Sequence, residues 1–132
     1  MSENKVFCII VTYRPDAGHL QHVLASIAQH TPHIILVDNT PGPHAAIATP
    51  EGVQCITLGE NLGIAAAQNI GIRQALAQGA NVIWLSDQDT IYPTNFLADM
   101  LTSLRACQAQ GIRLAALGPS YFDTHKGSVQ AF

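Results

Sequence analysis

Two aspartates, Asp87 and Asp89, stand two residues apart directly after the mainly apolar run Val82–Ser86. Charged residues make up only 11% of the chain, so two carboxylates beside a hydrophobic strand need a chemical explanation. Side chains at positions i and i+2 of a strand point to the same side, so we expect both acids to converge beyond the end of this strand. Carboxylate oxygens are hard ligands for divalent cations. The pair therefore predicts a cation site that serves a phosphate group.

Short polar segments follow other apolar runs in the same way. They are Thr12-Tyr13-Arg14, Asp38-Asn39 and Glu60-Asn61. Any one of them can simply form a turn or cap a helix, and that is the better interpretation of Asn39 or Asn61 taken alone. The carboxyl ends of parallel strands open on one edge of a sheet, so these segments and the two aspartates together predict a ligand site at that edge.

Five short apolar runs have the length and composition of strands. They are Val6–Val11, Ile34–Val37, Val53–Leu58, Val82–Leu85 and Leu114–Leu117. The first is apolar throughout, which is typical of a parallel strand buried on both faces. The tail from Gly118 to Phe132 is predicted to be a loop with an extended segment near Val129.

Helical patterns alternate with these strands. Asp16 is predicted to cap a first helix that turns Leu20, Val23, Leu24 and Ile27 inward. Leu62 to Gln78 is a second helix with Gly79 as its C′ residue. Pro93 is predicted to open a third helix, which buries Phe96, Leu97, Met100, Leu101 and Leu104 and stops at Gly111. The alternation predicts an α/β fold, a doubly wound and mostly parallel sheet with helices on both faces.

The second helix carries residues that could face a ligand. Asn61-Leu62-Gly63 precedes it, and the N–H groups at a helix start attract anions. For Ala65–Ala67, tight packing of the helix on the sheet is the better interpretation. Asn69 is a weak helix former in mid-helix, which favours a hydrogen-bonding role.

Bulk properties exclude several classes of protein. The 132 residues are enough for one domain, with a net charge of −3 and no basic surface for nucleic acid. No apolar run reaches membrane-spanning length, and the first residues do not form a secretory signal. The thiols of Cys8, Cys55 and Cys107 lack metal-binding spacing, so we expect them to be unpaired, mostly buried and in a reducing, cytoplasmic compartment.

The ordered motifs resemble those of family 2 glycosyltransferases, most closely the rhamnosyltransferases of bacterial polysaccharide assembly. The matching segments, which lie between about residues 5 and 120, are Val11-Thr12-Tyr13-Arg14-Pro15, Val37-Asp38-Asn39, Glu60 to Ile72 and Leu85-Ser86-Asp87-Gln88-Asp89. The resemblance implies a GT-A fold and inverting transfer of a sugar from a nucleotide donor, with dTDP-rhamnose favoured. The acceptor would be a cell-surface polysaccharide or lipopolysaccharide, as a glycan or lipid-linked chain. The full enzyme would work at the inner face of the cytoplasmic membrane.

The resemblance also assigns roles to residues. Thr12 and Tyr13 would line the base pocket, and Asp38 would contact the base or the ribose. Asp87 and Asp89 would serve the ribose and a Mg²⁺ or Mn²⁺ ion on the diphosphate, with Asp89 the stronger metal ligand. The complete predicted donor-binding set is Thr12, Tyr13, Arg14, Asp38, Asn39, Asn61, Gly63, Asn69, Arg73, Asp87 and Gln88.

The chain departs from the family pattern at two places. Gln68 stands where many members carry arginine, so Arg73, one turn later, is the candidate for that phosphate contact. The family's general base lies well past the aspartate pair, and neither Asp99, in a helix, nor Asp123, in the tail, matches its motif. We therefore expect the base beyond Phe132, and we interpret the chain as a donor-binding half without the acceptor half.

Three other classes of protein also use residues of this kind. An aspartate-dependent phosphotransferase of the haloacid-dehalogenase kind would place its nucleophile after the first strand, whereas this pair follows the fourth. A dinucleotide-binding domain would need glycines where Thr12-Tyr13-Arg14-Pro15-Asp16 stands. The interpretation as a truncated or non-catalytic nucleotide-sugar-binding module stays open.

His19 and His22 lack a nearby third metal ligand, so a solvated helix face is their better interpretation.

Overall fold

The computed structural model describes residues 4–119, 121–123 and 128–130, with side chains for 4–119. The chain divides into two compact units, Met1–Thr94 and Asn95–Phe132, which are described separately below. The prediction of one domain for the whole chain stays a prediction. Within the described residues, no helix is long and apolar enough to cross a membrane.

The first unit is built on a parallel sheet of four strands in the order β3-β2-β1-β4. The strands are β1 (Val6–Thr12), β2 (Ile34–Asp38), β3 (Val53–Thr57) and β4 (Val82–Ser86). Each agrees with a predicted strand to within one residue at either end. Because β2 and β3 follow on one side of β1 and β4 pairs with its other side, the strand order switches between β1 and β4.

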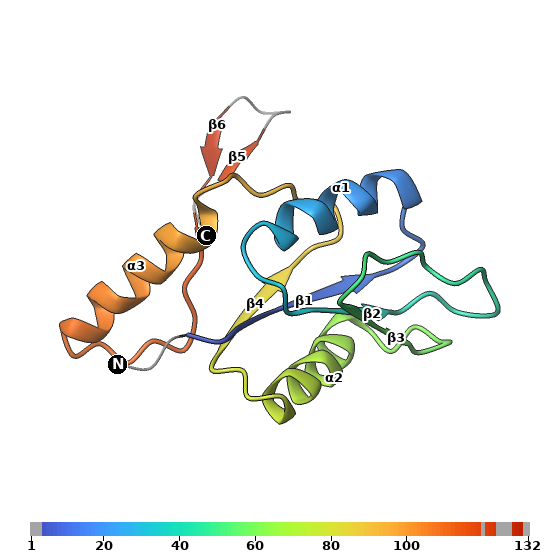
Figure 1. Ribbon diagram of the computed structural model, residues 1–132, viewed down its shortest axis with the longest axis horizontal. Helices are drawn as coiled ribbons and strands as arrows, with labels where there is room; N and C mark the ends of the chain where they lie inside the picture. The colour runs from blue at the N-terminus through green and yellow to red at the C-terminus, as the bar shows by residue number, and fades with distance from the viewer. Residues whose placement is uncertain (1–3, 120, 124–127, 131–132) are drawn as a thin grey trace. The chain divides into compact units, whose positions relative to one another are not determined.

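Two helices cover opposite faces of this sheet, as Figure 1 shows. They are α1 (Ala17–Ala28) and α2 (Ile64–Ala77). The carboxylate of Asp16 caps α1 by accepting a hydrogen bond from the backbone N–H of His19 at 2.8 Å. All four predicted inward residues of α1 are buried. The predicted α/β sheet with helices on both faces is therefore confirmed, and the central strands β1 and β2 are apolar because both of their faces are covered.

Helix α2 lies unusually close to the sheet. A Cβ atom added at Gly71 would stand 2.5 Å from Cγ2 of Ile9 and 3.1 Å from Cγ2 of Val37. Ala67 and Ala75 are buried on the same face of the helix. The tight packing predicted for Ala65–Ala67 holds for Ala67 alone, because the two alanines before it are exposed.

The cysteines only partly match their prediction. All three are unpaired thiols, and Cys8 is buried in the central strand, where burial raises the pKa of its thiol. Cys107 is half-buried, and Cys55 is exposed on the edge strand β3. The prediction of mostly buried thiols is therefore wrong for Cys55.

The second unit contains α3 (Phe96–Ala109) and an antiparallel pair formed by β5 (Tyr121–Asp123) and β6 (Ser128–Gln130). Helix α3 begins three residues after Pro93, so the predicted helix start is wrong. Its five predicted inward residues are half-buried. The strand predicted at Leu114–Leu117 is absent, since those residues form irregular backbone, whereas the extended segment near Val129 is present as β6.

We expect Gly71→Ala to lower the free energy of unfolding by about 1–3 kcal/mol, because the added methyl must displace side chains of β1 and β2. The matched control is Gly18→Ala in α1, where the added Cβ would only reach 3.6 Å from a carboxylate oxygen of Asp16. That change should raise stability by about 0.5–1 kcal/mol, since alanine favours a helix. Urea unfolding followed by circular dichroism measures both, and equal effects would contradict the close packing.

Candidate functional site

The predicted site lies at the carboxyl ends of β1, β2 and β4, where side chains join neighbouring strands. Thr12 and Asp38 are register partners at the ends of β1 and β2. The hydroxyl of Thr12 donates a hydrogen bond to Oδ1 of Asp38 at 3.0 Å, and both side chains are fully buried. A carboxylate buried in this way requires compensating donors, and the sequence supplies them locally.

The donors to Asp38 come mainly from the segment that follows it. Thr40 donates to Oδ1 through its hydroxyl at 2.8 Å and its backbone N–H at 3.3 Å. The other oxygen, Oδ2, lies 3.0 Å from Nε2 of His44. That contact is at ion-pair distance but lacks hydrogen-bond geometry, and Oδ2 accepts no hydrogen bond within the described part of the chain. Sequence reasoning missed both residues: a threonine two places after an aspartate is a recognisable turn signal, whereas His44 carried no signal.

The middle residue of the aspartate segment connects β4 to β1. Oε1 of Gln88 accepts from the backbone N–H of Tyr13 at 2.8 Å, and its Nε2 donates to the backbone oxygen of Tyr13 at 3.3 Å. The backbone N–H of Arg14 in turn donates to the hydroxyl of Thr40 at 2.8 Å. Hydrogen bonds therefore join the end of β1 to the end of β2 and to the segment that follows β4.

Arg14 has an uncommon backbone conformation for a residue with a side chain. Its φ is 45°, in the left-handed region that costs energy for most residues. The bond from its N–H to Thr40 stabilises this bend, and its guanidinium lies over the ring of Tyr13, 5.1 Å from the centroid. The bend turns the chain away from β1 immediately after the site.

Asp87 and Asp89 are both exposed and follow the end of β4 at Ser86. Strand β4 ends at Ser86, and Gln88 and Asp89 lie in a turn. The alternation of side chains along a strand, on which the prediction of converging carboxylates rested, therefore does not extend to Asp87 and Asp89. Within the described residues, no group of three or more His, Cys, Asp or Glu side chains is arranged to hold a metal ion. A cation at this position would need further ligands from a bound diphosphate or from water.

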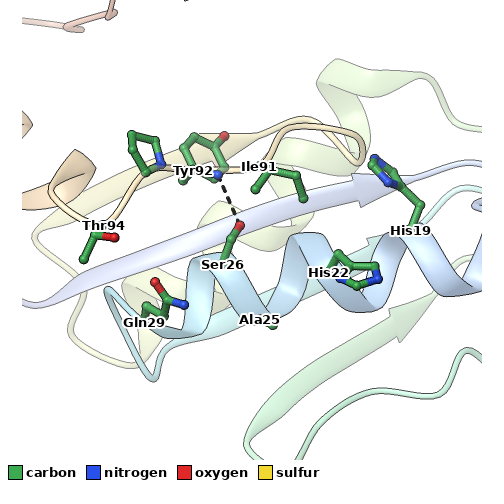
Figure 2. A pocket seen from close by; sticks show the side chains of 9 residues that line it. His19, His22, Ala25, Ser26, Gln29, Ile91, Tyr92 and Thr94 are labelled. Atoms are coloured by element: carbon green, nitrogen blue, oxygen red, sulfur yellow. Dashed lines mark hydrogen bonds between the residues drawn. The ribbon is translucent and has the colours of Figure 1, made fainter.

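Helix α1 fastens the segment that follows these acids. Nε2 of His19 lies 3.3 Å from the backbone oxygen of Asp89, and Oγ of Ser26 accepts from the backbone N–H of Tyr92 at 3.3 Å. A pocket of about 530 Å³ lies between α1 and this segment, and Figure 2 shows the side chains that line it. It is lined by His19, His22, Ala25, Ser26, Gln29, Ile91, Tyr92, Pro93 and Thr94. Both histidines are exposed, as expected for a solvated helix face.

Tyr92 closes this pocket against β4. Its hydroxyl donates to Oγ of Ser86 at 2.9 Å, and its ring meets that of Trp84 edge-on with centroids 4.7 Å apart. Burial raises the pKa of the Tyr92 phenol, so it stays protonated at neutral pH. Trp84 is 8% exposed, which confirms its predicted place in the core.

The two asparagines expected near the ligand serve the backbone ahead of α2. Oδ1 of Asn39 accepts from the N–H of Leu62 at 3.1 Å, and its Nδ2 donates to the oxygen of Gly63 at 3.1 Å. Oδ1 of Asn61 accepts from the N–H of Gly63 at 3.0 Å. These bonds hold Gly63 at φ 86°, where it caps α2. Both asparagines thus perform the turn-forming role expected of either alone, and their donor contacts stay predictions.

Asn69 and Arg73 are exposed and four residues apart on α2, so they share one face of the helix. Within the described residues, no hydrogen bond connects either side chain to the strand-end residues. The site is therefore assembled from the ends of β1, β2 and β4, while α2 contributes a separate polar face.

Comparison with known proteins identifies the family. The family model described as Glycosyl transferase family 2 matches residues 7–128. The chain belongs to glycosyl transferase family 2. It is 31% identical over 125 residues to the dTDP-rhamnosyl transferase RfbF of Shigella flexneri, a match that covers 93% of this chain and 40% of the relative. It is 34% identical over 121 residues to the galactofuranosyltransferase GlfT1 of Mycobacterium tuberculosis, covering 86% of this chain and 38% of that protein.

The predicted family and its rhamnosyltransferase-like character are thus confirmed. The α/β architecture with a parallel sheet agrees with the GT-A fold that the resemblance implied. The chain spans about two fifths of the length of these curated relatives.

The two asparagines Asn39 and Asn69 should respond differently to alanine. Asn39→Ala is expected to lower the free energy of unfolding by about 1–3 kcal/mol, since it leaves two backbone groups without partners. Asn69→Ala should leave stability unchanged or raise it by a few tenths of a kcal/mol, because alanine is the better helix former. Thermal and urea unfolding test both variants, and a large loss of stability in Asn69→Ala would contradict the exposed position of this side chain.

Proposed function

We propose that the carboxyl edge of the sheet binds the nucleotide-sugar donor of a glycosyltransferase. The observation that carries this proposal is the set of hydrogen bonds that joins the ends of β1, β2 and β4 through Thr12, Asp38 and Gln88. Ligands of open parallel sheets bind beyond the strand ends at the switch in strand order, and here the switch lies between β1 and β4. We call this set of strand-end residues, together with Tyr13, Arg14, Asp87 and Asp89, the donor site.

The nucleoside is the part of the donor that Asp38 suits best. Its Oδ2 is buried and accepts no hydrogen bond from the described residues, so it can accept one from a base N–H or a ribose hydroxyl. Tyr13, which directly follows Thr12 in the sequence, is 41% exposed and offers an aromatic face for the base. The bonds at Oδ1 keep this carboxylate in place before a ligand arrives.

Asp87 and Asp89 are chemically suited to a Mg²⁺ or Mn²⁺ ion on the diphosphate. Both carboxylates are exposed, and no described residue donates a hydrogen bond to either, so hard oxygens are available to a cation. Such an ion supplies positive charge to the nucleoside diphosphate as it leaves with additional negative charge. Gln88 positions the acids by fixing the turn that contains them.

For the whole enzyme we propose inverting transfer of rhamnose from dTDP-rhamnose to a bacterial surface glycan, at the cytoplasmic side of the membrane. An acceptor hydroxyl would form a bond to the anomeric carbon while the bond to the diphosphate breaks, and a general base outside the described residues would take the proton. The rhamnose preference rests on similarity to RfbF, and similarity to GlfT1 makes galactofuranose the competing sugar.

Calorimetric titration with dTDP, UDP and GDP, each with and without Mn²⁺, tests the donor site. We expect one nucleotide to bind more tightly with the metal, and Asp87→Asn and Asp89→Asn to weaken that metal-dependent binding by roughly tenfold or more. The matched control is Asp99→Asn on α3, which removes the same charge from an exposed helix position and should bind as the wild type does.

Two outcomes would refute parts of the proposal. Nucleotide binding that is absent, or equal in all three variants, would contradict the donor site. Metal-dependent binding without hydrolysis or transfer of the sugar would instead identify the chain as a nucleotide-sugar-binding module.

A further inference from the structure

Two hydrogen bonds hold the loop between β2 and β3 in place, and His44 lies between them in the sequence. Near its start, the backbone N–H of Gly42 donates to the oxygen of Gly59 at 3.1 Å. Near its end, Nε2 of Gln21 on α1 donates to the oxygen of Ala48 at 2.6 Å. These two bonds hold the loop beside the donor site. The side chain of His44, which lies between them in the sequence, contacts Asp38.

Both ring nitrogens of His44 face oxygen atoms. Nδ1 lies 2.9 Å from the backbone oxygen of Ala45, and Nε2 lies 3.0 Å from Oδ2 of Asp38. A neutral imidazole carries hydrogen on one nitrogen only, so one of these contacts would then set a lone pair against an oxygen. The doubly protonated imidazolium carries hydrogen on both nitrogens, so neither contact then sets a lone pair against an oxygen, and it places a positive charge against the buried carboxylate.

His44 therefore contacts Oδ2 of Asp38, the carboxylate oxygen proposed to bind the nucleoside. Oδ1 of Asp38 is occupied by Thr12 and Thr40, whereas Oδ2 has no hydrogen bond from the described residues and is approached by His44. The His44 side chain is 25% exposed, in contrast to the fully buried carboxylate. The ring can thus move into solvent more easily than Asp38 can change its position.

We propose that His44 is a pH-dependent cap of the donor site, which pairs with Asp38 when protonated and competes with the nucleoside for Oδ2. This inference rests on the proposed function, because it assigns the nucleoside to Asp38. Histidine is the side chain that ordinarily changes its charge between about pH 5 and 8. A charged ring pairs with Asp38 and closes the cap, whereas a ring that has lost its proton no longer has the charge that holds it there.

The other groups near the pair do not change their charge in this pH range. Cys55 on β3 is close enough to Asp38 for the carboxylate charge to add to the burial that raises the pKa of its thiol. Among the described residues, Arg14, beyond β1, is linked to Asp38 through the hydrogen bond from its backbone N–H to Thr40. Gln21 on α1 is neutral. The two bonds that hold the loop join uncharged groups, whereas the contact of His44 with Asp38 depends on the charge of the ring.

Titration with the nucleotide that binds best, at about pH 5.5 and about pH 8, tests the cap. We expect wild-type affinity to fall at the lower pH by roughly three- to tenfold more than that of His44→Ala. Comparison with His44→Ala removes the effect of protonating the diphosphate itself. His44→Lys, which stays charged, should bind weakly at both pH values. His22→Ala, at an exposed histidine of α1, should behave as the wild type does.

An equal loss of affinity in the wild type and in His44→Ala would overturn the cap. Failure of both proteins to bind any nucleotide at either pH would refute the proposed function instead. The pair itself is then tested by the NMR signal of the Asp38 carboxylate carbon. That signal should shift between the two pH values in the wild type but stay nearly constant in His44→Ala, and identical shifts would overturn the cap.

Discussion

The buried carboxylate of Asp38 is the constraint on which the site depends. A charge inside a protein is tolerated only where donors surround it, and here they come from β1 and from the loop that leaves β2. The same bonds bring Thr12 and Thr40 together and, through Thr40, hold the bend at Arg14. The geometry of the strand ends is therefore set before any ligand is present.

The second constraint is the close approach of α2 to the sheet. Gly71 allows the helix to lie against β1 and β2, and Asn39 fastens the turn that begins this helix. One strand end thus carries two adjacent residues with different tasks. Asp38 is directed at the site, whereas Asn39 is directed at the neighbouring turn, and this division explains why both are polar at the end of a buried strand.

The fold could be predicted because its signals are local. Apolar runs marked all four strands of the sheet, and the spacing of Leu20, Val23, Leu24 and Ile27 marked the buried face of α1. Pro93 gave a misleading helix start, because its fixed φ suits a first turn but does not require one. Leu114–Leu117 was apolar enough for a strand, yet a strand also needs a neighbour, and no local pattern reports one.

The site was predictable at the level of strand ends. The roles of Gln88 and His44 depend on contacts across 75 residues in one case and on loop geometry in the other, so composition could not reveal them.

The manner in which Gln88 contacts Tyr13 has an evolutionary consequence. Both hydrogen bonds go to backbone atoms, so the position of the acidic turn is independent of which side chain residue 13 carries. Under the role proposed for Tyr13, a lineage could therefore exchange this aromatic residue, and with it the preference for one nucleobase, without disturbing the arrangement of the acids. Under the same proposal, recognition of the base and handling of the diphosphate are separable traits, and related enzymes with different nucleotide donors could diverge in the first while conserving the second.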